Sequence, residues 1–203
     1  QYLDTLSSIP AGAPEILLGY SLGGRLALRH ALARPGRWAA LVLIAVSPGL
    51  ADPAARAARR ADDESLAAEI LAGGVPAFLE QWQRRPLIAT QTRLPAEWRS
   101  AMQARRRRLR PAGLAASLRQ FGQGALDPVW DRLPELRLPV LLAAGADDPA
   151  YIALAQAMRA RLPSAEFLLV PDAGHLAHLE NLRAFADGLR DFLRRHGLLS
   201  AES

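Results

Sequence analysis

Short apolar runs that alternate with helical segments constrain the fold of this 203-residue chain more than any other feature. The apolar runs are Ile16–Tyr20, Leu41–Val46, Val140–Ala144 and Phe167–Val170. Helical periodicity follows three of them, over Gly23–Ala33, Ala150–Leu162 and Leu182–Arg195. Continuous apolar strands separated by helices are typical of a parallel sheet that helices cover on both faces. The sequence therefore predicts an α/β fold.

The middle of the chain has a different pattern. Between Asp52 and Arg132 we find no strand, and glycine and proline breakers divide the stretch into about four helical segments. The breakers are Gly73-Gly74, Pro86, Pro95, Pro111 and Gly122–Gly124. The sequence thus predicts an α/β core formed by residues 1–51 and 133–203, with a helical insert over residues 52–132.

Composition excludes several classes of protein. The chain is 50% hydrophobic and 22% charged, which is typical of a globular protein, and no apolar run approaches the roughly 18–20 residues of a membrane span. Cysteine is absent, which excludes disulfides, zinc–thiolate sites and a thiol nucleophile. All 25 basic residues are arginine, so we interpret the pI of 10.8 as codon bias of a GC-rich genome and expect no nucleic-acid partner.

The first residues lack the features of a targeting segment. Residue 1 is Gln, and no charged segment followed by an apolar one comes after it, so we expect a cytoplasmic protein. Tyr2, Leu3 and Leu6 precede the breaker run Pro10–Pro14. We therefore expect the chain to start inside a helix and to be a fragment of a longer protein.

A G-x-S-x-G motif, Gly19-Tyr20-Ser21-Leu22-Gly23, joins the first predicted strand to the helix after it. At such a turn a serine is forced into a strained conformation that exposes its Oγ. We expect glycine at both ends of the motif because a Cβ at either position would clash in so tight a turn. The helix N-terminus would offer the N–H of Leu22 to a developing oxyanion. The motif in this context predicts that Ser21 is a nucleophile.

A serine nucleophile needs a base, and the base needs a group that orients it. Asp147 and Asp148 follow the third predicted strand and His175 follows the fourth, at the carboxyl ends of parallel strands where open α/β sheets place their sites. The order serine, acid, histidine is the one expected for this motif. Among the other histidines, His30 is in the middle of a helix and His178 lies one turn past His175, so both fit the role of the base less well.

Seven segments spread along the chain carry a family resemblance. They are GYSLGGRLAL at Gly19–Leu28, SPGL at Ser47–Leu50, AARRADD at Ala57–Asp63, FLEQWQRRPLIA at Phe78–Ala89, GLAASLRQFGQG at Gly113–Gly124, GADD at Gly145–Asp148 and PDAGHLAHLEN at Pro171–Asn181. The pattern resembles the α/β-hydrolase superfamily with a helical cap. Within it, the chain is most similar to the 2-succinyl-6-hydroxy-2,4-cyclohexadiene-1-carboxylate synthase (MenH) family.

The resemblance implies a lyase of menaquinone biosynthesis, which eliminates pyruvate from 2-succinyl-5-enolpyruvyl-6-hydroxy-3-cyclohexene-1-carboxylate. His175 would activate Ser21 to abstract a ring proton, and the oxyanion site would hold the charge that develops on the succinyl carbonyl. The family's G-x-x-D spacing favours Asp148 as the acid, with Asp147 as the alternative. The resemblance implies no metal and no organic cofactor. The alternative function is a serine esterase or C–C bond hydrolase with the same triad.

The implied substrate is a small molecule with three carboxylates, and arginine's planar fork suits a carboxylate better than lysine does. Arg25 lies one helical turn after Ser21 and shares its face of the helix. The resemblance places Arg25, Arg59, Tyr20 and Trp82 in the substrate pocket. For the neighbouring cap residue, Arg56, a substrate contact and simple solvation are both open.

A run of four arginines at 105–108 falls on a predicted cap helix. An apolar stripe on that helix would consist of Trp98, Met102 and Leu109, with Arg105 inside the stripe and Arg106 at its border. The resemblance implies a substrate-binding arginine here. The register allows Arg105 or Arg106, and the spacing favours Arg106.

The place of the nucleophile along the chain leads to a last expectation. The family has its nucleophile on the fifth strand, whereas Ser21 follows the first predicted strand. We therefore expect the N-terminal strands to be missing, together with the loop that carries the second oxyanion donor. The strand Ile16–Tyr20 would then present an unpaired apolar edge. We expect either a longer natural protein or a homo-oligomer that covers this edge, and residues 1–203 alone to be an incomplete catalyst.

Overall fold

A computed structural model describes residues 15–199, so the helix expected before Pro10 lies outside the described residues. The described chain divides into two compact units. The first, which we call the sheet unit, contains the described residues up to Pro48 and those from Val129 onward. The second, the helical unit, is Gly49–Pro128.

The sheet unit is built on a four-stranded sheet in which every pair of neighbours is parallel. In spatial order the strands are β1 (Ile16–Tyr20), β2 (Ala40–Ile44), β3 (Val140–Gly145) and β4 (Ala165–Val170). The parallel sheet confirms the predicted fold class, and each strand overlaps an apolar run of the sequence. Because the strands are parallel, their carboxyl ends meet at one edge, where Tyr20 lies opposite Ile44 and Gly145 opposite Val170.

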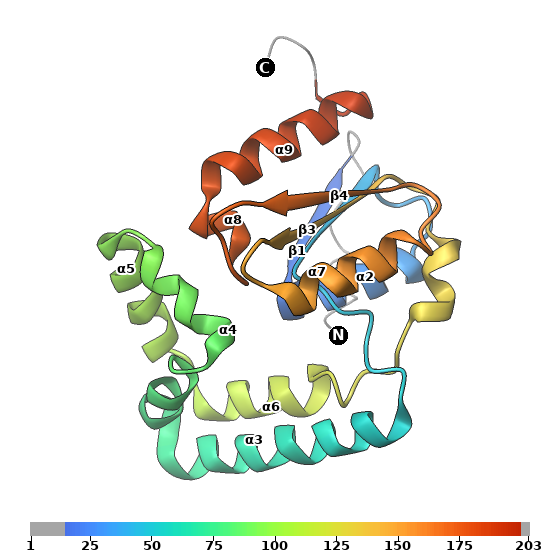
Figure 1. Cartoon of the computed structure of the whole chain (residues 1–203). Coiled ribbons are helices and arrows are strands. Elements are labelled where there is room, and N and C mark those ends of the chain that lie inside the picture. The colour runs from blue at the N-terminus through green and yellow to red at the C-terminus, as the bar shows by residue number, and fades with distance from the viewer. Residues whose placement is uncertain (1–14, 200–203) are drawn as a thin grey trace. The chain divides into compact units, whose positions relative to one another are not determined.

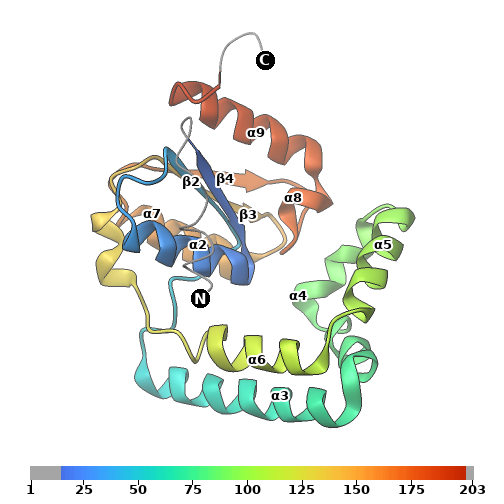
Figure 2. The same cartoon turned by 180° about the vertical axis from the view of Figure 1, so that it is seen from behind.

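Helices cover both faces of this sheet (Figures 1 and 2). One face carries α2 (Ser21–Ala33), α7 (Pro149–Arg159) and the 3₁₀ helix η2 (Trp130–Glu135), and the other carries α8 (Ala177–Glu180) and α9 (Leu182–Arg195). Every residue of β2 is buried. Leu41 and Leu43 belong to the core that packs against α2 and α7, and Val42 and Ile44 belong to the core that packs against α8 and α9. Successive strand residues point to opposite faces, so a strand covered on both sides has to be apolar throughout.

One side of β1 has no neighbour among the described strands, because β1 pairs only with β2. Leu18 in the middle of β1 is 47% exposed. An apolar strand edge is a template for pairing with another strand. That a preceding segment or a second copy covers this edge stays a prediction.

The helical unit contains no strand within residues 49–128, all of which are described. Its helices are α3 (Pro53–Trp82), α4 (Pro86–Ala89), the 3₁₀ helix η1 (Thr90–Arg93), α5 (Ala96–Arg107) and α6 (Pro111–Phe121). Helices α3 and α6 lie side by side in both views (Figures 1 and 2). The break expected at Gly73-Gly74 is a kink inside α3, where Gly74 has a φ of 76°. No helix within residues 15–199 is long and apolar enough to cross a membrane.

His30 is a buried histidine in the sheet unit, and we expect its protonation to couple stability to pH. Its side chain is 1% exposed, and its Nδ1 accepts a hydrogen bond of 3.0 Å from Trp38 Nε1, which requires a neutral ring. Burial, and to a lesser degree the charges of Arg34 and Arg37, lower the pKa of His30 below its ordinary value of 6.5. The unfolded chain therefore binds this proton more readily than the folded chain. The contribution of His30 to stability is complete above the unfolded pKa and is lost as the pH falls through the folded pKa.

We therefore expect the urea midpoint of the chain to fall as the pH is lowered from about 7 to about 5, across the ordinary histidine pKa. The variant His30→Gln keeps an acceptor for Trp38 but has no titrating ring, so its midpoint should fall less. An equal fall in both proteins would assign the pH dependence to other groups.

Candidate active site

Serine 21 is held at the sharp junction between β1 and α2. It is the first residue of α2 and has a φ of 49°, in the left-handed region that a non-glycine residue rarely adopts. Such a conformation costs about 1–3 kcal/mol and persists only where the surroundings enforce it. The strand-to-helix turn therefore produces the strained serine that the motif predicts.

The glycines that permit this turn are Gly19 and Gly24. A Cβ on Gly19 would lie 2.6 Å from the Cα of Gly24, and a Cβ on Gly24 would overlap Cγ2 of Val46. A Cβ on Gly23 would meet no atom within 4 Å other than its chain neighbours and the backbone of its own helix. The expectation that Gly23 is required sterically is therefore wrong. The close approach of α2 to the strand ends takes place one residue later, at Gly24, and the last glycine of the GYSLGG segment was the available signal.

His175 lies between Ser21 and Asp148. Its Nε2 is 3.1 Å from Ser21 Oγ, and its Nδ1 is 2.8 Å from Asp148 Oδ2. His175 and Asp148 are deeply buried, at 3% and 4% exposed, whereas the neighbouring Asp147 is exposed. An ionised carboxylate only accepts hydrogen bonds, so this geometry assigns the proton to Nδ1 and leaves Nε2 to accept from the serine hydroxyl. The three side chains can move a proton from Ser21 to His175 while Asp148 stabilises the imidazolium.

Asp148 is fixed by its place at the start of a helix. It is the N-cap of α7, and its Oδ1 accepts a hydrogen bond of 3.4 Å from the amide of Tyr151. One carboxylate oxygen thus caps the helix and the other faces the imidazole. The helix N-terminus favours the negative charge of the carboxylate.

The loop that carries His175 is held by the side chains of Glu180 and Asn181, which were not expected from the sequence. Glu180 accepts hydrogen bonds from the amides of Gly174 (2.8 Å) and Leu176 (3.3 Å), on either side of His175. Asn181 Nδ2 donates to the carbonyl of Pro171 over 2.9 Å. Both side chains end the PDAGHLAHLEN segment, and their spacing after the histidine was the signal that could have identified them.

Aromatic rings surround the imidazole of His175. The ring centroids of Tyr20 and Tyr151 are 5.3 Å and 4.6 Å from it, and Tyr20 is 4.9 Å from His178. Tyr151 was not among the residues expected from the sequence, and its position one turn after Asp148 was the signal that could have identified it. Burial, and secondarily the charge of His175, lower the pKa of His178. A neutral His178 would add no positive charge beside the imidazolium that forms if Ser21 gives its proton to His175.

Leu22 and Arg25 lie on the first turns of α2. An N–H in the first turn has no acceptor in its own helix, so the amide of Leu22 can serve an oxyanion beside Ser21. Arg25 is half-buried one turn after Ser21. Within residues 15–199 there is no group of three or more histidine and acidic side chains placed to hold a metal ion.

In the helical unit, Arg106 and Trp82 lie together. The guanidinium of Arg106 is 4.6 Å from the centroid of the Trp82 ring, and its NH2 donates to Gln91 Oε1 over 2.9 Å. Arg105 is exposed. The expectation that Arg105 lies inside an apolar stripe is therefore wrong. Helix α5 ends at Arg107, so Leu109 falls outside the helix, and Arg106 is the arginine that turns toward other side chains.

Arg59 pairs with a buried acid within its own helix. Its Nε is 2.9 Å from Oδ1 of Asp63, one turn further along α3. The NH1 group of Arg56 lies 3.6 Å from Oδ1 of Asp127. The structure thus groups Ser21, Asp148 and His175 with Tyr20 in the sheet unit. It pairs Trp82 with Arg106, and separately Arg59 with Asp63, in the helical unit.

Comparisons with known proteins show which family the chain is similar to. Residues 1–188 match the model of the alpha/beta hydrolase family. A 2-succinyl-6-hydroxy-2,4-cyclohexadiene-1-carboxylate synthase of Serratia proteamaculans is 35% identical over 89% of this chain and 68% of its own length. A Bacillus subtilis protein to which the same synthase name is given provisionally is 40% identical over 87% of this chain, which spans only 65% of that relative. The solved structure of MenH from S. aureus superposes with a TM-score of 0.87 at 30% identity, over 91% of this chain and 69% of that one.

Proposed function

The chain belongs to the α/β-hydrolase family, and we propose that it acts in menaquinone biosynthesis as a 2-succinyl-6-hydroxy-2,4-cyclohexadiene-1-carboxylate synthase. The proposed reaction eliminates pyruvate from 2-succinyl-5-enolpyruvyl-6-hydroxy-3-cyclohexene-1-carboxylate. The observation that carries it is the hydrogen-bonded series Ser21–His175–Asp148, at 3.1 Å and 2.8 Å, in a chain 35% identical to a synthase of that name. The substrate is a small polycarboxylate, and we expect the reaction in the cytoplasm.

The proposed reaction is a proton abstraction that needs no acyl-enzyme, and the hydrogen bond between Ser21 and His175 gives the serine proton its acceptor. His175 Nε2 accepts the hydroxyl proton of Ser21 as Ser21 Oγ takes a proton from the ring. The electron pair of the broken C–H bond moves onto the succinyl carbonyl oxygen, which the amide of Leu22 stabilises. When that electron pair returns, a double bond forms between ring carbons 2 and 3, the existing double bond moves from carbons 3 and 4 to carbons 4 and 5, and the C–O bond from carbon 5 to the enolpyruvyl group breaks. The imidazolium of His175 protonates the leaving enolate to give pyruvate. Asp148 keeps the imidazole in one tautomer throughout.

Arginine and aromatic side chains are proposed to bind the substrate. Arg25 in the sheet unit, and Arg59 and Arg106 in the helical unit, are assigned to its carboxylates, since a guanidinium can meet a carboxylate with two hydrogen bonds. Tyr20 and Trp82 are assigned to contacts with the substrate. The contact of Trp82 with the Arg106 guanidinium supports a joint role for these two residues.

The experiment that tests the function compares two activities of the purified full-length protein. The cyclohexene substrate is generated in situ, and released pyruvate is measured by coupling to lactate dehydrogenase. Hydrolysis of a neutral p-nitrophenyl ester is measured in parallel. Pyruvate release that stops when Ser21 is replaced by Ala supports the synthase. Ester hydrolysis without pyruvate release would replace the proposal with a serine hydrolase on the same triad.

The carboxylate-binding arginines lead to a prediction that separates charged from neutral substrates. Losing a charge-assisted hydrogen bond typically costs about 1.5–3 kcal/mol, so Arg25→Ala and Arg59→Ala should each lower kcat/KM for the tricarboxylate by about 10- to 150-fold. Hydrolysis of a neutral ester should change little. Arg105→Ala is the matched control, because Arg105 is exposed on α5 and is expected to contribute to neither reaction. Equal losses on both substrates would remove the carboxylate-binding role.

A further inference from the structure

Among the described residues, the Arg59 guanidinium is held at one of its three nitrogens. Within residues 15–199 its partner is Asp63, whose Oδ1 accepts from Nε over 2.9 Å. The side chain of Arg59 is 40% exposed. Fixing Nε leaves the NH1 and NH2 groups as a pair of parallel donors at the end of the side chain. Such a pair matches the two oxygens of a carboxylate.

Asp63, in contrast, is buried and only half satisfied. It is 4% exposed, and a Cβ at Gly122, just after α6, would overlap its Oδ2. Among the described residues, Oδ2 has no hydrogen-bond partner. A buried carboxylate with an unpaired oxygen lowers stability relative to an apolar side chain of similar size. Stability therefore does not explain an aspartate at this position, whereas its hydrogen bond to Arg59 does.

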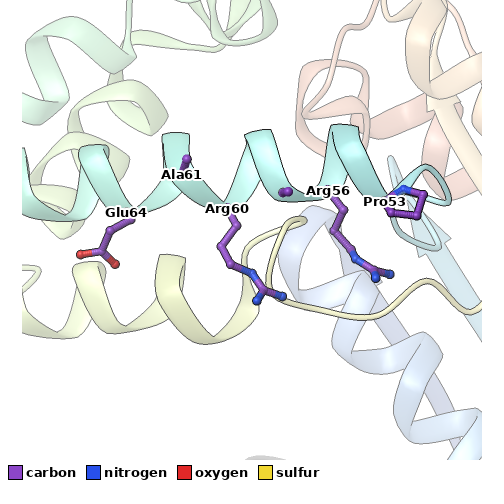
Figure 3. Close-up of a pocket in the computed structure, with 6 residues that line it drawn as sticks. Pro53, Arg56, Arg60, Ala61 and Glu64 are labelled. Carbon is purple, nitrogen blue, oxygen red and sulfur yellow. The ribbon is translucent and has the colours of Figure 1, made fainter.

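The neighbouring charges on α3 have a different arrangement. Figure 3 shows Arg56, Arg60 and Glu64 along a hollow of about 510 Å³. Arg60 donates from Nε and NH2 to the carbonyl of Gly124, and Glu64 pairs with Arg119 over 2.6 Å. Arg60 is thus bound through two nitrogens to one backbone oxygen, and the hollow contains an acid. Arg59 differs from these arginines because its Nε donates to a buried carboxylate, that of Asp63.

We propose that Asp63 is a positioning residue, which fixes the Nε of Arg59 so that NH1 and NH2 are presented together to a carboxylate of the substrate. This inference rests on the proposed function, which supplies the polycarboxylate. An arginine held in one conformation before binding loses less side-chain entropy when the ligand binds. Asp63 therefore strengthens carboxylate binding without touching the substrate.

The test compares Asp63→Leu with Asp63→Asn. Leucine has a similar size but no acceptor, so KM for the tricarboxylate should rise about tenfold while kcat changes little. Asparagine keeps an acceptor for Arg59 Nε, so Asp63→Asn should stay within about threefold of the wild-type KM. Circular dichroism and urea unfolding verify that each variant folds. If Asp63→Leu does not fold, Asp63→Ala gives the same comparison without added bulk.

Two controls separate positioning from a general effect on the helical unit. Glu64→Gln breaks the ion pair with Arg119 at the next position of α3, and it should leave KM unchanged. In an Arg59→Ala background, Asp63→Leu should produce no further rise in KM, since the group that it positions is already gone.

A binding measurement makes the result independent of the elimination reaction. Tricarballylate has three carboxylates and no enolpyruvyl group, so calorimetric titration with it reads the carboxylate site alone. The protein could bind tricarballylate with an affinity that Arg59→Ala and Asp63→Leu both lower, and yet release no pyruvate. That result supports the positioning role and overturns only the lyase. Unchanged KM and unchanged tricarballylate affinity in Asp63→Leu would overturn the positioning role. Equal losses in Asp63→Asn and Asp63→Leu would overturn it as well.

Discussion

Replacing Ser21 or His175 by alanine, or Asp148 by asparagine, is expected to lower the rate of pyruvate release by about 100-fold or more, because each substitution removes one link of a proton-transfer series. In Asp148→Asn the side chain can donate to Nδ1 and thereby hold the imidazole in the wrong tautomer. The fold should survive in each variant, since the substitutions preserve or reduce side-chain size. The measurements are the coupled pyruvate assay and a thermal unfolding curve for each protein.

The neighbouring acid supplies the control for this prediction. Asp147 is exposed and adjacent to Asp148, so Asp147→Asn removes the same charge from the same loop without touching His175. We expect it to retain nearly full activity. The double variant Ser21→Ala/His175→Ala should be no slower than either single variant, because residues that act as a unit are not additive. A severe loss in Asp147→Asn together with a mild one in Asp148→Asn would contradict the assignment of the acid.

The strands and the order of the triad could be predicted because both depend on local sequence. An apolar run such as Ile16–Tyr20 is bounded by breakers and matches β1 from end to end. The helix expected over Leu182–Arg195 also has the bounds of α9, since its apolar positions repeat with helical spacing. Once parallel strands are predicted, the residues that follow them are expected at one edge of the sheet. His175 and Asp148 lie there, within hydrogen-bond distance of each other.

The contacts that position these side chains could not be predicted, because they join residues whose proximity depends on packing. The stripe that was expected to include Arg105 assumed that the helix continues to Leu109, but the helix ends at Arg107. The pairing of Glu180 with the amides beside His175 depends on the turn between β4 and α8. The burial of Asp63 depends on the packing of α3 against the chain at Gly122. Periodicity identifies a helix face, but it does not identify what covers that face.

The two glycines that follow Leu22 are expected to respond in opposite ways to the same substitution. In Gly24→Ala, the new Cβ would overlap Cγ2 of Val46 and lie 2.8 Å from the carbonyl oxygen of Gly19. Part of this obstacle is backbone, so rotamer changes cannot relieve it. Overpacking of this kind typically costs about 1–3 kcal/mol, and we expect the upper end of that range or a chain that does not fold. The measurement is the free energy of unfolding in urea.

In Gly23→Ala, the new Cβ meets no atom within 4 Å other than its chain neighbours and the backbone of its own helix, and position 23 is inside α2. Alanine in a helix is more favourable than glycine by about 0.5–1 kcal/mol, so this variant should be at least as stable as the wild type. The pair thereby separates two explanations for glycine in the motif. If the fold requires it, Gly23→Ala should be as damaging as Gly24→Ala, which would contradict the geometry of the turn. If Gly23→Ala folds well but releases pyruvate slowly, glycine at this position serves the approach of the substrate to Ser21 and the Leu22 amide. Of the three glycines in the GYSLGG segment, the fold then requires Gly19 and Gly24.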